Sequence, residues 1–298
     1  MRASSLRLIA LARTAGSYTA GKKLAVGANA MQNAQQFRGT PALSRIRYTV
    51  PNSFTALSLL LGLGSIATGH HGELELAAWM IVWCGLLDVM DGLAARLLKA
   101  TSSFGAEFDS MADLVAFGVA PAMLVLEAGM QIGGIELGTG SFWTLLVSVG
   151  LFVLAGAMRL ARFNLTSHKP VKGWFTGVPI TAAGGGLTAT AVILLIRYEE
   201  FARLLPLQIY LPVLMITLAL LMVSTLRFPK IVRRNSKVIN SFQAFNVAAS
   251  YYCGITRSYP EFLFSMSVFL LASGLIAGWL TRPSGQYGDD GASDATGA

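Results

Sequence analysis

The chain of 298 residues is 54% hydrophobic and 13% charged, and it carries a formal net charge of +8. Soluble domains contain about 25% charged residues, so this composition excludes a protein that is soluble along most of its length. The positive charge would suit a nucleic-acid partner, but the Lys and Arg residues lie in short segments between long apolar stretches, which is typical of membrane proteins and argues against nucleic-acid binding. We therefore expect an all-α, polytopic membrane protein.

The two ends of the chain differ in composition from the middle. Residues 1–46 are rich in Ala, Ser, Gly and Arg, and the first acidic residue is Glu73. This segment is interpreted as a disordered arm, or alternatively as a basic segment for targeting or for binding a membrane surface. Residues 283–298 are rich in Gly, Ser and Asp, which predicts a disordered, solvated tail.

Apolar stretches that approach the length of a membrane span follow the arm. A helix of about 20 residues crosses a bilayer. We predict transmembrane helices at residues 51–68, 74–98, 104–128, 142–163, 177–196, 207–226 and 262–280. The apolar segment at residues 242–255 is shorter and contains Asn246, so the sequence leaves seven or eight spans open. The expected organisation is a core at residues 47–240 and a C-terminal membrane hairpin at 241–282.

The basic residues predict the orientation of these spans. With the N-terminal arm in the cytoplasm and eight alternating spans, all but three of the 23 Lys and Arg residues face the cytoplasm, the exceptions being Arg197, Arg203 and Arg257. Short cytoplasmic loops are enriched in Lys and Arg, so this distribution supports the orientation. With seven spans, only Arg257 and the tail would change sides.

All aspartates before the tail lie in the second and third predicted spans, near their cytoplasmic ends: Asp88, Asp91, Asp109 and Asp113. A charged side chain at the centre of a membrane helix costs at least about 2.5–3.5 kcal/mol. Such side chains persist where they line a polar cavity or bind a cation. Four of them in two neighbouring spans therefore indicate a functional site.

The spacing of the aspartates predicts that they converge. Asp88 and Asp91 are three residues apart and Asp109 and Asp113 are four apart, so each pair shares a helix face. The short turn at residues 100–103 joins the two helices as an antiparallel pair. Carboxylates gather only where cations neutralise them or where some are protonated. Oxygen ligands suit hard cations such as Mg²⁺, Mn²⁺ or Ca²⁺, and two such ions about 3.5–4 Å apart would form the clamp used in phosphoryl displacement.

These residues belong to a longer pattern. Residues 88–113 read D-x2-D-G-x2-A-R-x8-G-x3-D-x3-D. This segment resembles the signature of the CDP-alcohol phosphatidyltransferases at every fixed position, and the wider resemblance covers about residues 45–235. The resemblance implies six core transmembrane helices around a polar cavity open to the cytoplasm. It also implies a homodimer that transfers a phosphatidyl-type group from CDP-diacylglycerol to the hydroxyl of a small alcohol.

The resemblance further implies roles by position. The metal ligands would be Asp88, Asp91, Asp109 and Asp113, with two Mg²⁺ or Mn²⁺ ions, and Asp113 would also be the general base. The residues implied for binding the CDP-lipid are Asn52, Thr55, Gly92, Ala95, Arg96 and Gly105. The residue types suit this chemistry in their own right, because an alcohol needs a base within hydrogen-bond reach and a pyrophosphate needs its charge neutralised.

The acceptor is less closely defined. Residues 51–55, 158–164 and 223–230 resemble the branch of the family whose acceptor is serine, although that branch often has a second proline soon after the one found here at Pro179. Arg159 and Arg162 share a helix face and would bind the acceptor's carboxylate or phosphate. The alternative for both arginines is anchoring to lipid headgroups.

Two alternatives for the function stay open at this point. The acceptor could be glycerol 3-phosphate, inositol or inositol phosphate in place of serine. In a different class, a cation transporter would also place aspartates inside a membrane. The outer halves of the spans, however, contain no matching relay of charged residues. We expect the bacterial inner membrane as the location, and an organellar membrane if the N-terminal arm is a transit peptide.

Overall fold

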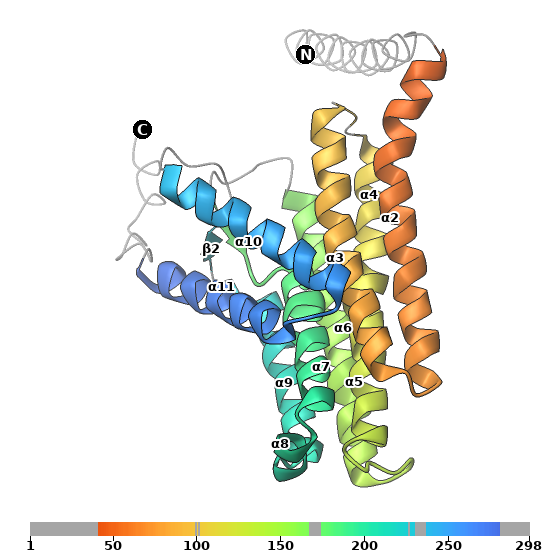
Figure 1. Ribbon diagram of the computed structural model, residues 1–298, viewed down its shortest axis with the longest axis vertical. Coiled ribbons are helices and arrows are strands. Elements are labelled where there is room, and N and C mark those ends of the chain that lie inside the picture. The colour runs from red at the N-terminus through yellow and green to blue at the C-terminus, as the bar shows by residue number, and fades with distance from the viewer. Residues whose placement is uncertain are drawn as a thin grey trace, which may run out of the picture.

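The computed structural model describes residues 41–98, 100, 102–166, 174–225, 227–229 and 237–280. This part of the chain is a bundle of helices with one small pair of strands (Figure 1). The predicted arm up to residue 40, the tail after residue 280 and the basic residues Lys99, Lys169, Lys172, Lys230, Arg233 and Arg234 lie outside the described residues. The elements are α2 (Pro41–His70), α3 (Leu74–Leu97), α4 (Ser103–Asp113), η1 (Leu114–Val119), α5 (Ala120–Gln131), α6 (Gly140–Thr166), β1 (Trp174–Thr176), η2 (Ala182–Ala189), α7 (Thr190–Arg197), α8 (Glu199–Leu204), α9 (Leu207–Val223), β2 (Arg227–Pro229), α10 (Lys237–Thr256) and α11 (Pro260–Leu280).

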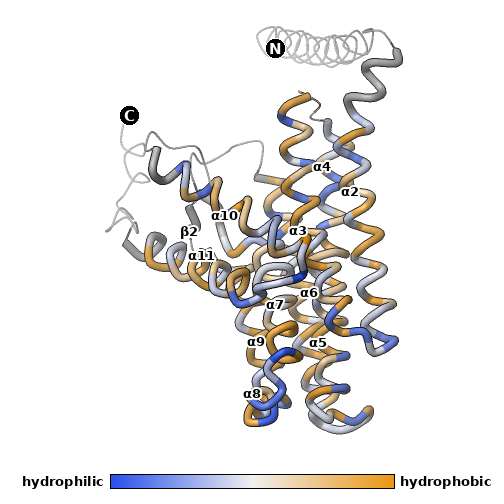
Figure 2. Tube along the Cα trace, in the orientation of Figure 1, coloured by the Kyte–Doolittle hydropathy of each residue, from blue (hydrophilic) through white to orange (hydrophobic). Residues whose placement is uncertain are grey.

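The apolar helices confirm the prediction of an all-α, polytopic membrane protein. Four are long and apolar enough to cross a membrane: Tyr48–His70, Leu74–Leu97, Ser103–Gln131 and Gly140–Leu165. Three shorter apolar helices are Ala182–Arg197, Leu207–Val223 and Pro260–Ile276. Figure 2 shows hydrophobic residues along the bundle and hydrophilic residues at its lower end, around α8. Of the seven or eight predicted spans, the described residues thus provide seven apolar helices, and α10 is not among them.

Helix α2 begins at Pro41, earlier than the predicted start of the first span at residue 51. It continues through Pro51, which lies inside the helix. Proline removes one backbone hydrogen bond from a helix, and transmembrane helices tolerate this loss where neighbouring side chains compensate. In the same turns, the Ser53 hydroxyl donates to the Thr49 carbonyl at 2.7 Å. The last residues of the predicted N-terminal arm are therefore helical.

The third span is continuous but irregular. α4, η1 and α5 follow one another without a break, and η1 is a π-helical segment that begins directly after Asp113. A second π-helical segment, η2, packs against it. At the contact, a Cβ on Gly184 would collide with the Phe117 carbonyl oxygen, so this close backbone approach requires glycine. The two wide turns thereby fix the end of the helix that carries Asp109 and Asp113.

The remaining contacts place the aspartate helices at one side of the bundle. α2 packs along the length of α3, and α6 packs along α9. Large side chains that are almost fully buried, among them Trp79, Phe117 and Phe152, fill the space between the helices. The strands β1 and β2 pair antiparallel and link the segment after α6 to the segment after α9.

Helices α10 and α11 lie where the sequence predicts a C-terminal membrane hairpin. They form a hairpin at one side of the bundle and run obliquely to its long helices (Figure 1). The Trp83 indole donates to the Gly254 carbonyl at 2.7 Å, and the Tyr251 hydroxyl donates to the Leu86 carbonyl at 2.6 Å. At the other end of α3, Arg197 forms an ion pair with Glu75 at 3.2 Å and donates to the Arg257 carbonyl at 2.7 Å. The hairpin is thus fastened to α3 and α7.

Candidate functional site

Three of the four membrane aspartates form a tight cluster between α3 and α4. Asp88, Asp91 and Asp109 each offer a carboxylate oxygen, and these oxygens lie within 4.8 Å of one another. Asp91 is buried, while Asp88 and Asp109 are half-buried. The N-cap of α4 helps to set this geometry, because the Ser102 hydroxyl accepts a hydrogen bond from the Gly105 amide at 3.0 Å.

The cluster fits a hard divalent cation. Oxygen ligands lie about 2.0–2.6 Å from Mg²⁺ or Ca²⁺, so oxygens that share one ion are separated by up to about 5 Å. Among the ion pairs of the described residues, none neutralises Asp88, Asp91 or Asp109. Three carboxylates held this closely need a cation or a proton to balance their charge. The donor set contains only oxygen, which favours Mg²⁺, Mn²⁺ or Ca²⁺ over zinc.

Helix α2 contributes a hydroxyl that orients one ligand of this cluster. The Thr55 hydroxyl lies 3.0 Å from Asp91 Oδ2 and 3.3 Å from the Pro51 carbonyl oxygen, and Thr55 is 4% exposed. The family resemblance implies that Thr55 binds the CDP-lipid. In the structure it donates to the carboxylate of Asp91, which is the arrangement by which outer groups fix metal ligands.

Asp113 lies at the end of α4, one turn beyond Asp109. Its charge interacts with those of Asp88, Asp91 and Asp109 and with that of Arg159 on α6. Arg159 is only 8% exposed, and its Nε has no hydrogen-bond partner among the described residues. A buried guanidinium with a free donor is costly unless a ligand satisfies it. Asp113 and Arg159 thus place a carboxylate and an unsatisfied guanidinium donor beside the cluster of Asp88, Asp91 and Asp109.

The small residues of the signature have different surroundings. A Cβ on Gly92 would meet only Arg96, at 3.7 Å, so the surface at Gly92 is open. Arg96 donates from Nε to the Gly92 carbonyl at 2.8 Å. A Cβ on Gly105 would lie 3.3 Å from Asn52 Oδ1, so Gly105 allows α2 to approach α4 closely. Ala95 is half-buried on α3.

The sequence predicts that Arg162 binds the acceptor together with Arg159, but in the structure Arg162 makes another contact. Its guanidinium donates to the carbonyls of Val223, Met222 and Ser224 at 3.0, 3.3 and 3.3 Å. These carbonyls close the C-terminal end of α9, where a cation is favourable. Gly177, with φ +78°, leaves the space for this contact.

Sequence reasoning did not single out a polar contact between α4 and α6. The Ser110 hydroxyl and the Asn164 amide lie 3.1–3.2 Å apart, and Asn164 Nδ2 donates to Glu107 at 3.3 Å. Asn164 ends the motif that begins at Met158, but no spacing within the chain indicates that it contacts α4. The contact holds the aspartate helix against the helix that carries Arg159.

Comparison with protein families gives one match. The family model for CDP-alcohol phosphatidyltransferases matches residues 48–225. This range contains all four membrane aspartates and both arginines of α6. It ends before α10 and α11.

Individual relatives are similar over about three fifths of the chain. The CDP-diacylglycerol–serine O-phosphatidyltransferase of Helicobacter pylori (strain ATCC 700392 / 26695) is 37% identical over 183 residues, which are 61% of this chain and 72% of the relative. The enzyme of the same name from Bacillus subtilis (strain 168) is 34% identical over 180 residues, 60% of this chain and 89% of the relative. The archaetidylserine synthase of Methanothermobacter thermautotrophicus is 29% identical over 184 residues, 61% of this chain and 70% of the relative.

Proposed function

Because the chain belongs to the CDP-alcohol phosphatidyltransferase family, we propose that it transfers a phosphatidyl group from CDP-diacylglycerol to the hydroxyl of L-serine, giving phosphatidylserine and CMP. The observation that carries this proposal is the cluster of Asp88, Asp91 and Asp109 inside a membrane helix pair. The names of the relatives support serine as the acceptor.

The aspartate cluster is where the pyrophosphate of the donor binds. Asp88, Asp91 and Asp109, with Asp113 beside them, would hold two Mg²⁺ or Mn²⁺ ions. Bound divalent ions supply charge neutralisation of the pyrophosphate and of the departing CMP. Thr55 keeps the Asp91 carboxylate oriented through its hydroxyl, 3.0 Å away. Arg96, Asn52 and the open surface at Gly92, with Ala95 and Gly105, border the space assigned to the nucleotide.

Asp113 takes the proton of the acceptor. The hydroxyl oxygen of serine forms a bond to the phosphorus that carries the diacylglycerol, and the bond from that phosphorus to the CMP oxygen breaks. The hydroxyl proton passes to the Asp113 carboxylate, and CMP leaves with the bonding electrons. A positioned base of this kind contributes about 10²–10⁴-fold to the rate. No covalent intermediate with the protein is needed.

Arg159 binds the carboxylate of serine. Its Nε has no partner among the described residues, and its charge lies close enough to interact with that of Asp113. A guanidinium suits a carboxylate because it offers parallel N–H donors. With the carboxylate held there, the serine hydroxyl is brought to the base. Arg162 is assigned instead to the end of α9.

The membrane arrangement follows from the basic residues. The aspartate cluster faces the cytoplasm, the favoured location is a bacterial inner membrane, and the active protein is a homodimer. The positive-inside distribution supports the orientation, and the dimer is what the resemblance of residues 88–113 to the CDP-alcohol phosphatidyltransferases implies.

The experiment that tests the function is CMP release from the purified protein in detergent, with CDP-diacylglycerol and Mg²⁺ or Mn²⁺. Serine, glycerol 3-phosphate, inositol and inositol phosphate are compared as acceptors. We expect release that depends on serine. Release with another acceptor only would refute serine and keep the reaction. An absence of release with every acceptor and metal, from folded protein, would refute the transferase and favour a cation transporter.

A further inference from the structure

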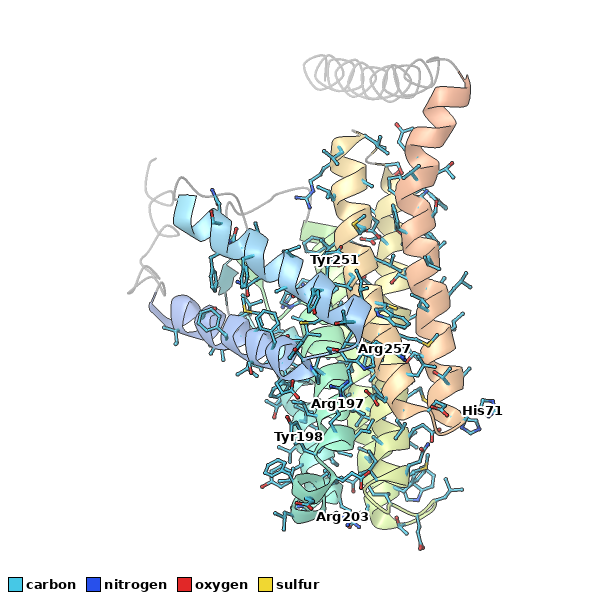
Figure 3. All side chains as sticks on the ribbon, viewed as in Figure 1. His71, Arg197, Tyr198, Arg203, Tyr251 and Arg257 are labelled. Atoms are coloured by element: carbon cyan, nitrogen blue, oxygen red, sulfur yellow. The ribbon has the colours of Figure 1, made fainter. Side chains whose placement is uncertain are left out.

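A pocket of about 350 Å³ lies between α3, η2, α10 and α11. Its walls are mostly apolar. Its polar side chains include Gln243, Asn246 and Ser250 of α10, and others are Thr181, Thr190 and Ser267. Pockets for small molecules measure about 300–1,000 Å³, so this one suits part of a lipid more than a whole diacyl lipid. Tyr251, labelled in Figure 3, marks its position beside α3.

The pocket lies next to the aspartate cluster around the surface of α3. Val82, Gly85, Leu86 and Val89 line it. Their spacing of three, four and seven residues puts them on one helix face. Asp88 and Asp91 lie on another face of the same turns, and at 3.6 residues per turn Gly92 falls between the two faces.

Gly92 leaves the path between these faces open. A Cβ at this position would contact only the guanidinium of Arg96, at 3.7 Å. A ligand with its phosphates at the aspartates can therefore cross α3 at Gly92, where the guanidinium of Arg96 is the side chain that it meets. Val89, which is 44% exposed, lies where that path enters the pocket.

We propose that this pocket holds one acyl chain of the CDP-activated lipid while the pyrophosphate of the same molecule lies at Asp88 and Asp91. The inference rests on the proposed function and extends the substrate site to the α10–α11 hairpin, which lies beyond residues 48–225 matched by the family model. An acyl chain gains little free energy when it moves from the bilayer into an apolar pocket, because lipid is as apolar as the pocket wall. The pocket therefore selects the donor by chain shape and keeps its head group in place.

Contacts of the hairpin with α3 and η2 hold the walls of the pocket together. The Tyr251 hydroxyl donates to the Leu86 carbonyl at 2.6 Å, directly at the pocket wall. On the other wall, a Cβ on Gly186 of η2 would lie 2.7 Å from the Ser267 hydroxyl of α11, so the hairpin sits closely on η2. Arg197 donates to the carbonyl of Arg257 at 2.7 Å and so holds the turn between α10 and α11; both residues are labelled in Figure 3.

Photo-cross-linking of the wild-type protein tests the location. The probe is CDP-diacylglycerol with a diazirine in one acyl chain, and the adducts are mapped by mass spectrometry. We expect adducts on the peptides with residues 82–89 and 242–251, lost when unlabelled CDP-diacylglycerol competes but kept with an equal amount of phosphatidylglycerol. Adducts on other helices only, or equal competition by both lipids, would overturn the proposal.

A pair of tryptophan variants on α10 tests the consequence for catalysis. Val247 lines the pocket, whereas Ile255 is 75% exposed and does not line it. We expect Val247→Trp to raise the KM for a dioleoyl donor about tenfold relative to a dihexanoyl donor, which is about 1.4 kcal/mol, and Ile255→Trp to leave this ratio unchanged. An unchanged ratio in Val247→Trp, with wild-type protein active toward serine, would refute the pocket but keep the function. Wild-type protein without serine-dependent CMP release would refute the function itself.

Discussion

Two pairs of charged residues in this protein have the same spacing along a helix but make different kinds of contact. Asp88 and Asp91 on α3 are three residues apart, and so are Arg159 and Arg162 on α6. Both aspartates meet Asp109 of the neighbouring helix in one cluster. The two arginines separate, because Arg159 is buried beside Asp113 whereas Arg162 donates to the end of α9. A shared helix face is therefore only a precondition, and the neighbouring element decides which group each side chain binds.

The largest expected effect concerns Asp113, the aspartate beside Arg159. We expect Asp113→Asn to lower kcat about 10²–10⁴-fold, because the amide cannot accept the acceptor's proton. Turnover is measured as CMP release in the presence of serine. Insertion and purification should stay normal, since the substitution removes a buried charge without changing the side-chain shape.

Glu127 provides the matched control for that variant. It lies in α5 of the same continuous span, is 6% exposed and contacts His70 at 3.0 Å and Gln131 at 3.1 Å, away from the cluster. Glu127→Gln should keep kcat near that of the wild type. Substantial turnover in Asp113→Asn would remove Asp113 as the base.

The next effect separates the two arginines. Arg159→Ala should raise the KM for serine about 10- to 100-fold and change the KM for CDP-diacylglycerol much less, because hydrogen bonds to charged groups contribute about 1.5–3 kcal/mol. Arg159→Lys should restore part of the loss. If the KM for serine stayed constant in Arg159→Ala, the arginine would return to a role in anchoring the helix to lipid headgroups.

A smaller effect tests the contact from α2. Thr55→Val keeps the side-chain shape and removes the hydroxyl that lies 3.0 Å from Asp91. Loss of an outer partner of a metal ligand costs about 10–100-fold in metal affinity, and we expect the lower end of this range for a single hydroxyl. Activity is titrated with Mn²⁺, and Ser53→Ala, on the exposed side of α2, serves as the control. The same half-saturating Mn²⁺ concentration in Thr55→Val and in the wild type would contradict this role.

The smallest effect on catalysis is expected at Arg162. Arg162→Ala should lower the free energy of unfolding by about 1 kcal/mol, because it removes a cation from the carbonyls at the end of α9. Thermal unfolding in detergent measures this change. The KM for serine should remain within about twofold of the wild type, a difference of about 0.4 kcal/mol. A large rise in that KM without loss of stability would restore Arg162 as an acceptor-binding residue and remove the contrast with Arg159.

The convergence of Asp88, Asp91 and Asp109 was predictable from the sequence because helix periodicity and a short turn between α3 and α4 leave few other arrangements. The lengths of the apolar stretches predicted the spans, because a helix of about 20 apolar residues crosses a bilayer. The π-helical segments were not predictable, since the approach of Gly184 to Phe117 depends on contacts between distant segments. The contacts of Thr55 with Asp91, of Arg162 with α9 and of Asn164 with Ser110 also join different helices, and spacing within one helix carries no information about them.

The start of α2 and the course of the hairpin could not be predicted from the lengths of the apolar stretches. Apolar length predicted a first span from residue 51, but the helix begins at Pro41. A transmembrane helix tolerates a proline such as Pro51 in its interior. Length also predicted that residues 262–280 cross the membrane, but it contained no information on the oblique course of α10 and α11 relative to the long helices of the bundle (Figure 1). That course is set by contacts such as those of Trp83 and Tyr251.

We expect transfer to serine to depend on a divalent cation held by the aspartates of α3 and α4. The most direct test is serine-dependent CMP release before and after thorough chelation, followed by addition of Mg²⁺ or Mn²⁺. We predict that release stops on chelation and returns with the metal in the wild type, but does not return in Asp91→Asn. Release that continues after the metal has been removed would contradict the claim.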